Sequence, residues 1–297
     1  MPLDLERQRP DDAGADTDAA AVAGLDALDT PTVVATPWWR KLLSTWLPPF
    51  VALTLFVVIW QIVWASAITS EFKVPAPAAV WDEFAATVAD GQVWTILWTS
   101  ISRAFIGFAI ALLIATPLGL LVARVAVVRA AIGPLLTGMQ SLPSVAWVPA
   151  AVLWFGLTDA TIYFVVLAGS IPSIANGLVA GIDQIPPILP RVGKVLGAGG
   201  LTAARHILLP AALPGYLAGC KQGWAFSWRS LMAAEIIAAG PLLGFGLGAY
   251  LKQGSDFSNM PGVIAAIFLI LIVGIGIELL VFRPLERRVL RARGLAS

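Results

Sequence analysis

The chain has 297 residues, of which 58% are hydrophobic and only 12% charged, and its mean hydropathy is +0.84. Soluble domains usually carry about 25% charged residues, so this composition excludes an ordinary soluble protein and indicates that lipid surrounds most of the chain. The net charge of +1 gives no basic excess for nucleic acid, and the single cysteine, Cys220, excludes an internal disulfide.

The first 45 residues differ in character from the rest. They hold many aspartates between small residues, and they lack the basic start, short apolar run and cleavage site of a signal peptide. Low hydrophobicity with excess negative charge predicts a disordered cytoplasmic tail and pre-membrane segment over residues 1–45. We expect residues 46–290 to form a transmembrane domain and residues 291–297 a cytoplasmic C-terminus.

Six segments after the tail are apolar and long enough to cross the hydrocarbon core as helices, which takes about 20 residues. They lie at about residues 46–66, 96–123, 131–155, 160–182, 213–238 and 262–282. The loop at 67–94 predicts a turn followed by a short amphipathic helix. The sequence therefore predicts an all-α membrane protein with six transmembrane helices.

The basic residues orient these helices, because Lys and Arg collect in cytoplasmic loops. With the N-terminus inside, only Lys73 and Lys252 lie in outer segments. The inner segments hold Arg7, Arg9, Arg40, Lys41, Arg124, Arg129, Arg191, Lys194, Arg205, Arg283, Arg287, Arg288, Arg291 and Arg293. Both termini are therefore expected in the cytoplasm of a bacterial cell, with the chain in its inner membrane.

The inner loop at 183–212 is too long and too patterned for a simple connector. Three prolines precede a short helical stretch at 191–196, and Gly197, Gly199 and Gly200 can supply a turn with positive φ. A second short helix, at about 201–208, is expected to end at Pro210. Two short helices with exposed apolar residues could fit a cleft of a partner protein. The alternative is a hairpin on the membrane surface without a partner.

The end of this loop resembles a known signature. Gly197, nine residues, and then Ile207-Leu208-Leu209-Pro210 are similar to the cytoplasmic loop of binding-protein-dependent ABC importer permeases. That loop begins with an acidic residue, whereas this chain has Arg191, so Arg191 is expected to meet an acidic group of the partner instead. The resemblance implies an ATPase-coupling site made of Arg191, Lys194, Gly197, Ile207, Leu209 and Pro210.

The resemblance covers about residues 50–290 and points to the nitrate/sulfonate/taurine branch. It rests on TSISRAFIGF (99–108), SLPSVAWVPAAVLWFG (141–156), MAAEII around Glu235 and LERR (285–288). It implies the type I importer permease fold. It also implies a second permease copy in a homodimer, two cytoplasmic ATPase subunits that bind ATP-Mg, and an extracytoplasmic solute-binding protein.

No phosphate-binding loop of the form GxxxxGK[ST] occurs in the chain. ATP hydrolysis is therefore expected from a partner, and the chain is expected to be neither an enzyme nor the holder of a cofactor. The glycine-rich GFGLG at 244–248 follows no strand, so a flexible re-entrant or loop segment outside the fifth span is the expected reading. The single histidine, His206, cannot build a metal site alone.

Ionisable residues within a span are costly and usually face the bundle interior or a water-filled cavity. The tentative substrate pathway consists of Arg103, Lys221, Trp228, Arg229 and Glu235. A cationic cavity would attract an anion. Alternatives remain for each cation: Arg229 could pair with Glu235 or a backbone carbonyl, Lys221 could snorkel to the interface, and Arg103 could serve structure or gating.

The predicted function is ATP-driven import of a small anionic solute such as a sulfonate, taurine or nitrate. A vitamin precursor or an aromatic carboxylate is the alternative solute. An ion-coupled secondary transporter is the alternative class, but such chains usually show repeated halves, and no convincing repeat is found here. An intramembrane enzyme would need clustered catalytic or metal-binding residues in the spans, which the sequence lacks.

Overall fold

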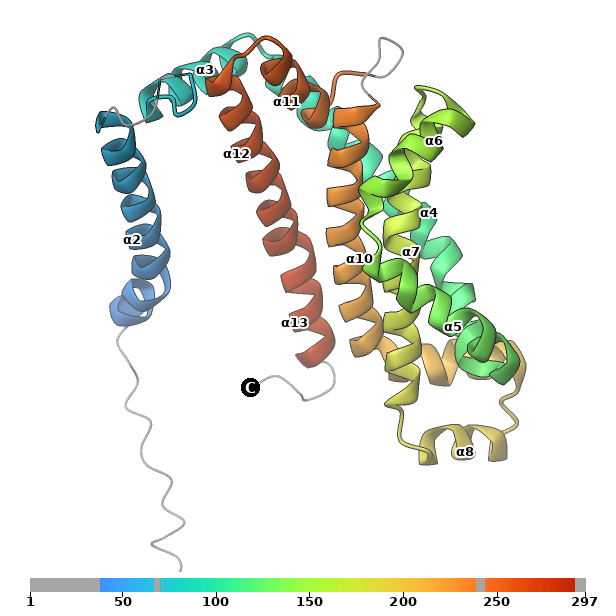
Figure 1. Ribbon diagram of the computed structural model, residues 1–297. Helices are drawn as coiled ribbons and strands as arrows, with labels where there is room; N and C mark the ends of the chain where they lie inside the picture. Colours follow the sequence, from blue (N-terminus) through green and yellow to red (C-terminus); the bar gives the residue numbers. More distant parts are fainter. Residues whose placement is uncertain (1–37, 67–69, 71, 239–243, 292–297) are drawn as a thin grey trace, which may run out of the picture. The chain divides into compact units, whose positions relative to one another are not determined.

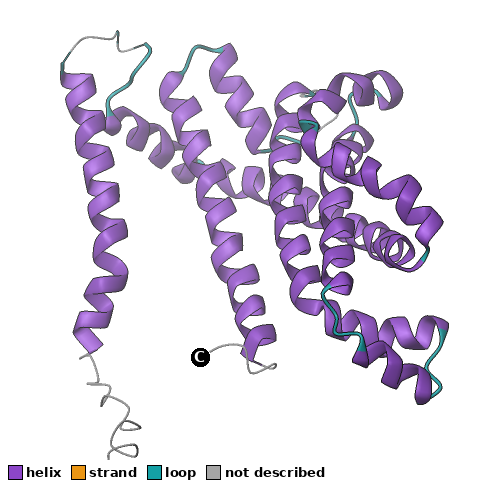
Figure 2. Ribbon diagram, turned by 60° about the horizontal axis from the view of Figure 1, so that its bottom comes forward, coloured by secondary structure: helices purple, strands orange, loops and turns teal. Residues whose placement is uncertain are grey.

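A computed structural model describes residues 38–66, 70, 72–238 and 244–291. In this part of the chain the regular structure is helical throughout, with no strand (Figure 2). The chain divides into two compact units, residues 1–59 and 60–297. Most of the predicted acidic tail, residues 1–37, lies outside the described residues. The pre-membrane segment that follows is helical: α2 covers Trp38–Ala65 and so begins before the first predicted span, which starts at about residue 46.

Helices α4, α7 and α10 form the centre of the second unit (Figure 1). Helix α4 covers Gln92–Arg124, α7 covers Asp159–Asp183, and α10 covers Leu209–Ile237. Their facing sides are rich in Gly, Ala and Ser, which lets the backbones approach closely. The buried side chains of these three helices make most of the core.

Helices α7 and α10 are packed through glycines. A Cβ atom at Gly219 would lie only 2.6 Å from the Cα of Gly177, and one at Gly215 would lie 2.5 Å from the Cα of Gly181. The glycines recur every four residues on both helices, so each pair stacks above the next along one face. Small residues at this spacing are typical of tightly packed transmembrane helices.

The third predicted span, 131–155, is not one helix. Helix α5 (Ala126–Ser141) ends before Pro143, a 3₁₀ turn covers Ser144–Trp147, and α6 covers Val148–Phe155. Leu142 has an extended backbone with ψ of 125°, as expected for a residue that precedes proline. Pro143 also lacks the N–H that would continue the hydrogen-bond ladder of α5.

Four helices in the described part of the chain are apolar and long enough to cross a membrane. They are Leu47–Ala65, Gln92–Arg124, Asp159–Asp183 and Met260–Arg291. The predicted fifth span lies within α10, which has 29 residues but carries Lys221, Arg229 and Glu235. These charges lower its hydropathy without shortening it. The total of six transmembrane helices therefore stays a prediction.

The remaining elements lie at the two ends of the bundle. Helices α3 (Pro77–Ala89) and α11 (Leu247–Asp256) lie at one end, and α3 confirms the short helix predicted within 67–94. At the other end, α8 (Ile188–Val195) lies beyond the end of α7 (Figure 1). The last long helix runs through α12 (Met260–Ile277), a π-helical turn η3 (Glu278–Phe282) and α13 (Arg283–Arg291).

The second short helix predicted in the inner loop does not end at Pro210. Helix α9 (Gly200–Ala203) and the π-helical turn η2 (Ala204–Leu208) continue directly into α10. Pro210 follows the π-helical turn η2, and a local π-helical adjustment of this kind lets a helix continue through a proline. The inner segment is therefore a hairpin whose second arm is fused to a long helix of the bundle.

Candidate functional site

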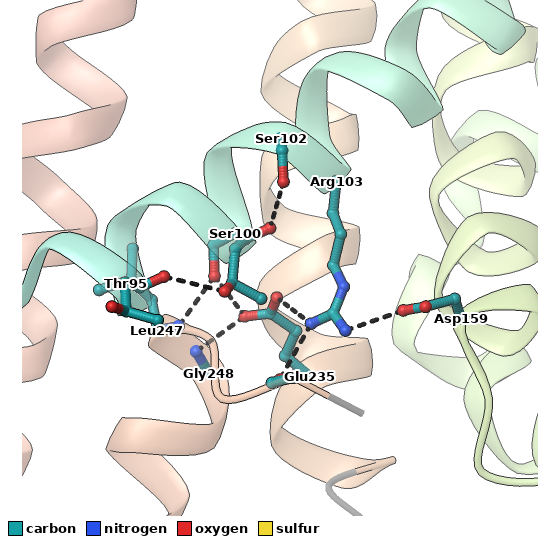
Figure 3. A network of polar contacts seen from close by, with 10 residues as sticks. Thr95, Ser100, Ser102, Arg103, Asp159, Glu235, Leu247 and Gly248 are labelled. Carbon is teal, nitrogen blue, oxygen red and sulfur yellow. Dashed lines mark hydrogen bonds and ion pairs between the residues drawn. The ribbon is translucent and has the colours of Figure 1, made fainter. Parts of the chain in front are cut away.

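A buried ion pair joins α4 to α10. Nη1 of Arg103 donates to Oε1 of Glu235 at 3.1 Å, and both side chains are more than nine-tenths buried. Nη2 of Arg103 lies 2.8 Å from Oδ1 of the exposed Asp159 at the start of α7, and Nη1 also donates to the carbonyl of Gly244 at 3.3 Å (Figure 3). One guanidinium thus connects two carboxylates and a loop.

The same carboxylate completes the start of α11. The first N–H groups of a helix have no partner within the helix. The N–H of Gly248 donates to Oε2 of Glu235 at 3.0 Å, and the N–H of Leu247 donates to Oγ of Ser100 at 2.8 Å. The hydroxyl of Ser100 in turn donates to Oε2 of Glu235 at 2.7 Å (Figure 3). The network therefore fastens α4, α7, α10 and α11 to one another.

The glycines of GFGLG pack against this network. A Cβ atom at Gly246 would lie 2.5 Å from Oε1 of Glu235, and one at Gly248 would lie 2.5 Å from its Cβ. These two residues therefore allow a close approach of the backbone to a buried carboxylate. The expectation of a loop segment holds for residues 244–246, which lie outside any helix, whereas Leu247 and Gly248 already belong to α11.

One face of α10 is exposed and partly polar. Between the two ends of the helix, the exposed positions are Ala218, Gln222, Ala225 and Arg229. At about 100° per residue they fall within an arc of about 60°, so they form a single stripe along the helix. The opposite faces of α10 are buried against the other helices. A stripe that carries a glutamine and an arginine is costly against lipid, so it is expected to face water or another polypeptide.

Arg229 does not pair with Glu235. Its Nε donates to the carbonyl of Ala225 at 3.0 Å, and its guanidinium lies over the ring of Phe226, 4.7 Å from the centroid. The two terminal nitrogens have no ion-pair or hydrogen-bond partner within the described part of the chain. The ring and the carbonyl orient the side chain, and its remaining donors are free for a ligand.

Lys221 lies near the opposite, inner end of α10. Its Nζ is 2.5 Å from Oε1 of Glu278 and 3.7 Å from Oε2 of Glu286. The three side chains line a cavity of about 430 Å³ between α10 and the η3–α13 segment. Glu278 was not among the residues predicted from the sequence. It lies within the sixth predicted span, where an acidic residue needs a partner, and this requirement could have identified it.

Trp228 belongs to the core. Its ring is 7% exposed and stacks on Trp224, with 6.5 Å between ring centroids. A Cβ atom at Gly274 of α12 would lie 3.3 Å from its Nε1. Of the five residues of the predicted pathway, the structure therefore brings together Arg103 and Glu235, while Lys221 pairs with Glu278, Trp228 packs in the core and Arg229 lies on the exposed stripe.

The inner hairpin is held by a glycine turn. The N–H of Ala198 donates to the carbonyl of Gly193, and the N–H of Gly197 donates to that of Lys194. With φ of 79° at Gly197, these bonds form a Schellman motif that ends α8. Gly200 also has positive φ, at 50°, so two of the three predicted turn glycines adopt the left-handed conformation, whereas Gly199 does not.

The two arms of the hairpin touch at Ile207. A Cβ atom at Gly193 would lie 2.1 Å from Cδ1 of Ile207, so the glycine lets this side chain pack directly against α8. Leu209 and Pro210 begin α10 at the base of the hairpin. Beside it, Arg129 and Asp183 form a two-point ion pair with distances of 2.9 and 2.5 Å, and the hydrogen bonds and charge of Asp183 raise the pKa of Arg129.

Helix α8 presents an apolar face to its surroundings. The exposed apolar residues are Ile188, Leu189, Val192, Val195 and Leu196, and the last two are 87% and 79% exposed. They fall within an arc of about 120°, and the exposed Arg191 lies about 40° outside it, whereas the exposed Lys194 lies on nearly the opposite face. An exposed apolar patch of this kind, with a polar residue at its border, is typical of a protein-binding surface.

The described residues hold no group of three or more His, Cys, Asp or Glu side chains that could bind a metal ion. His206 lies exposed on the hairpin, with Nδ1 3.2 Å from the carbonyl of Thr202. Cys220 is buried as a free thiol. The site therefore offers helix faces and ion pairs rather than a catalytic group.

Comparison with known proteins agrees with this arrangement. Residues 115–291, more than half of the chain, match the family model described as binding-protein-dependent transport system inner membrane component. The taurine transport system permease protein of Escherichia coli is 27% identical over 242 residues, which cover 80% of this chain and 86% of that protein.

Two further relatives have similar identity. A putative ABC transporter permease protein of Methanocaldococcus jannaschii is 28% identical over 228 residues, or 75% of this chain and 84% of that one. The bicarbonate transport system permease protein of Synechococcus elongatus is 27% identical over 265 residues, or 85% and 92% of the two chains. The chain therefore belongs to the family of ABC transporter permease subunits, in its nitrate/sulfonate/taurine-type branch, in which the ATPase is a separate partner.

Proposed function

We propose that this chain is the translocation subunit of an ATP-driven importer that carries a small anionic solute into the cytoplasm of a bacterial cell. Six transmembrane helices would be present, with the fifth in α10 and both termini in the cytoplasm. The observation that carries the proposal is the exposed apolar face of α8, in a hairpin whose second arm continues into α10. A cytoplasmic ATPase subunit that moved α8 would move α10 with it.

The polar stripe of α10 is proposed to line the solute path between two copies of the chain. Such a partner copy would remove the stripe from lipid, and water between the copies would solvate Gln222 and Arg229. The extracytoplasmic binding protein would deliver solute near α3, α6 and α11. In this arrangement the ion pair of Arg103 and Glu235 stabilises the bundle at the end where α11 lies, and Lys221 forms ion pairs with Glu278 and Glu286.

The free donors of Arg229 support an anionic solute. A guanidinium binds sulfonate, carboxylate or bicarbonate through charge-assisted hydrogen bonds, which are stronger than neutral ones. The relatives named for taurine and bicarbonate transport act on solutes that carry such groups. Vitamin precursors or aromatic carboxylates remain the alternative solutes, and an aromatic one could also stack near Phe226.

Replacing Val195 by aspartate is expected to weaken capture of the ATPase subunit. The substitution places a charge at the most exposed apolar position of α8, and this charge would lose its hydration at the centre of an interface. We therefore expect the affinity for the ATPase subunit to fall by about tenfold or more. The measurement is co-purification of the ATPase subunit with the tagged permease. Val127→Asp is the matched control, because Val127 is also exposed, at 78%, and lies in the first turn of α5. Equal capture by both variants would contradict the docking role.

Replacing Arg229 by leucine is expected to lower uptake of an anionic solute by about tenfold or more, because a charge-assisted contact is lost. Arg229→Lys should keep part of the rate, since the charge remains. Uptake of radiolabelled taurine, bicarbonate and benzoate into reconstituted vesicles measures both rate and preference. Arg129→Leu is the control, since Arg129 pairs with the exposed Asp183 and lies outside the proposed solute path. Unchanged rate and preference in Arg229→Leu would show that Arg229 does not select anions.

A further inference from the structure

The last helix has two faces of opposite character. On one face, Phe282, Glu286, Val289 and Leu290 line the cavity beside α10, and Glu286 lies 3.7 Å from Lys221. At about 100° per residue, these four positions occupy an arc of about 100°. This face of α13 is therefore engaged with the bundle.

The other face carries four arginines. They are Arg283, Arg287, Arg288 and Arg291. All four are exposed, and none has an ion-pair or hydrogen-bond partner in the described part of the chain. They span an arc of about 140° that points away from the cavity-lining arc. Four unneutralised guanidinium groups at this density would be unfavourable without an anion nearby.

The length of the helix places these arginines at the membrane surface. Met260–Arg291 is one candidate span of 32 residues, which corresponds to about 48 Å of helix. The hydrocarbon core is about 30 Å thick and the bilayer with its headgroups about 40–45 Å. The apolar part lies in α12, so α13 reaches the headgroup layer, where phosphate groups lie at the same depth as the guanidinium groups.

We propose that the arginine face of α13 is a binding site for anionic phospholipid headgroups. Guanidinium and phosphate form paired, charge-assisted hydrogen bonds, and basic clusters next to a span attract anionic lipid. The opposite face of α13 contacts α10 through the ion pair of Glu286 with Lys221. Lipid bound to the arginine face would therefore also stabilise the packing of α13 against α10. The inference requires only that α12 crosses a membrane and that α13 lies at its surface, so it does not depend on ATP-driven import or on the direction of transport.

The test compares lipid retention by the full-length permease. The protein is equilibrated with equal amounts of phosphatidylglycerol and phosphatidylcholine, and retained lipids are counted by native mass spectrometry. The wild-type chain is expected to prefer phosphatidylglycerol. The variant R283Q/R287Q/R291Q is expected to reduce that preference by at least about tenfold, since each of the three arginines contributes about fivefold at the membrane surface. The control variant R191Q/K194Q/R205Q removes three exposed cations from the inner hairpin and should keep the preference.

Three outcomes would overturn the proposal. The first is equal preference in the two triple variants. The second is displacement of the bound lipid by excess inorganic phosphate, which would assign the site to a soluble phosphate. The third is normal lipid preference in R283Q/R287Q/R291Q together with loss of the ATPase subunit, which would assign the arginine face to a protein partner. Failure of uptake in vesicles would leave the lipid result unaffected, so the two proposals fail separately.

Discussion

Replacing Glu235 by alanine is expected to be the most destabilising single change at the polar sites, at about 3–5 kcal/mol. The substitution leaves the buried Arg103 without its buried counter-ion and the N–H of Gly248 without its acceptor. Because the carboxylate joins α4 and α10 to the first turn of α11, its loss should loosen several helices at once. The measurement is the apparent melting temperature of the detergent-solubilised permease, followed by size-exclusion chromatography with fluorescence detection.

Two further variants show whether the burial of the pair is responsible. Asp159→Ala removes the second partner of Arg103. Because the side chain of Asp159 is 56% exposed, this change should lower the free energy of unfolding by no more than about 1 kcal/mol. The double variant with Arg103→Leu and Glu235→Leu lacks both buried charges, so it should be more stable than the variant with Glu235→Leu alone. A melting temperature for Glu235→Ala equal to that of the wild type would show that the network does not hold the bundle together.

Replacing Gly219 by leucine is expected to prevent normal packing of α7 against α10. The first added carbon atom would lie 2.6 Å from the Cα of Gly177, and no flexible side chain is present there to move away. Forced overpacking of this kind costs about 3 kcal/mol or more, because the two helices must separate along their length. We expect little folded, monodisperse protein and a large drop in melting temperature.

The matched control for this change is Gly276→Leu. Gly276 lies in α12, and an added Cβ would meet nothing within 4 Å, so the same substitution should shift the melting temperature only slightly. Gly133→Leu in α5 provides a second control for the same reason. If Gly219→Leu melts like these controls, then the close approach of α7 and α10 is not a determinant of stability.

The sequence predicted the elements that depend on local pattern. The amphipathic helix within 67–94, the glycine turn after α8 and the long apolar helices α2, α4, α7 and α12 follow from hydropathy and from Gly and Pro positions. The break in 131–155 was also readable, because Pro143 constrains Leu142 to an extended backbone. The prediction missed it because it weighed hydropathy above the proline rule.

The partners of the charged residues could not be predicted from the sequence. Arg103 and Glu235 are 132 positions apart, and helical periodicity gives the face of a residue but not the residue opposite it. Arg229 illustrates the difficulty, because its pairing with Glu235 was plausible from their positions on one helix. The structure instead places Glu235 in the buried network and Arg229 on an exposed face, with Phe226 as its neighbour.

The family of the chain was predictable because its signature is local. Gly197 and the Ile207–Pro210 stretch lie within one hairpin, so their spacing can be read directly from the sequence. The family match over residues 115–291 confirms the predicted family. Arg191 departs from the acidic start of that signature, and it lies exposed beside the apolar face of α8. An acidic group on the ATPase subunit remains the expected partner for it.

The proposed role of the hairpin at 183–212 is to couple solute movement to a separate ATPase. Its most direct test is uptake of radiolabelled solute into vesicles that contain the purified permease, with the binding protein supplied on the side of α11 and ATP on the side of α8. We predict uptake only when the ATPase subunit and ATP are both present, and a much lower rate when the permease carries Val195→Asp. Uptake by the permease alone, driven by an ion gradient, would contradict the account.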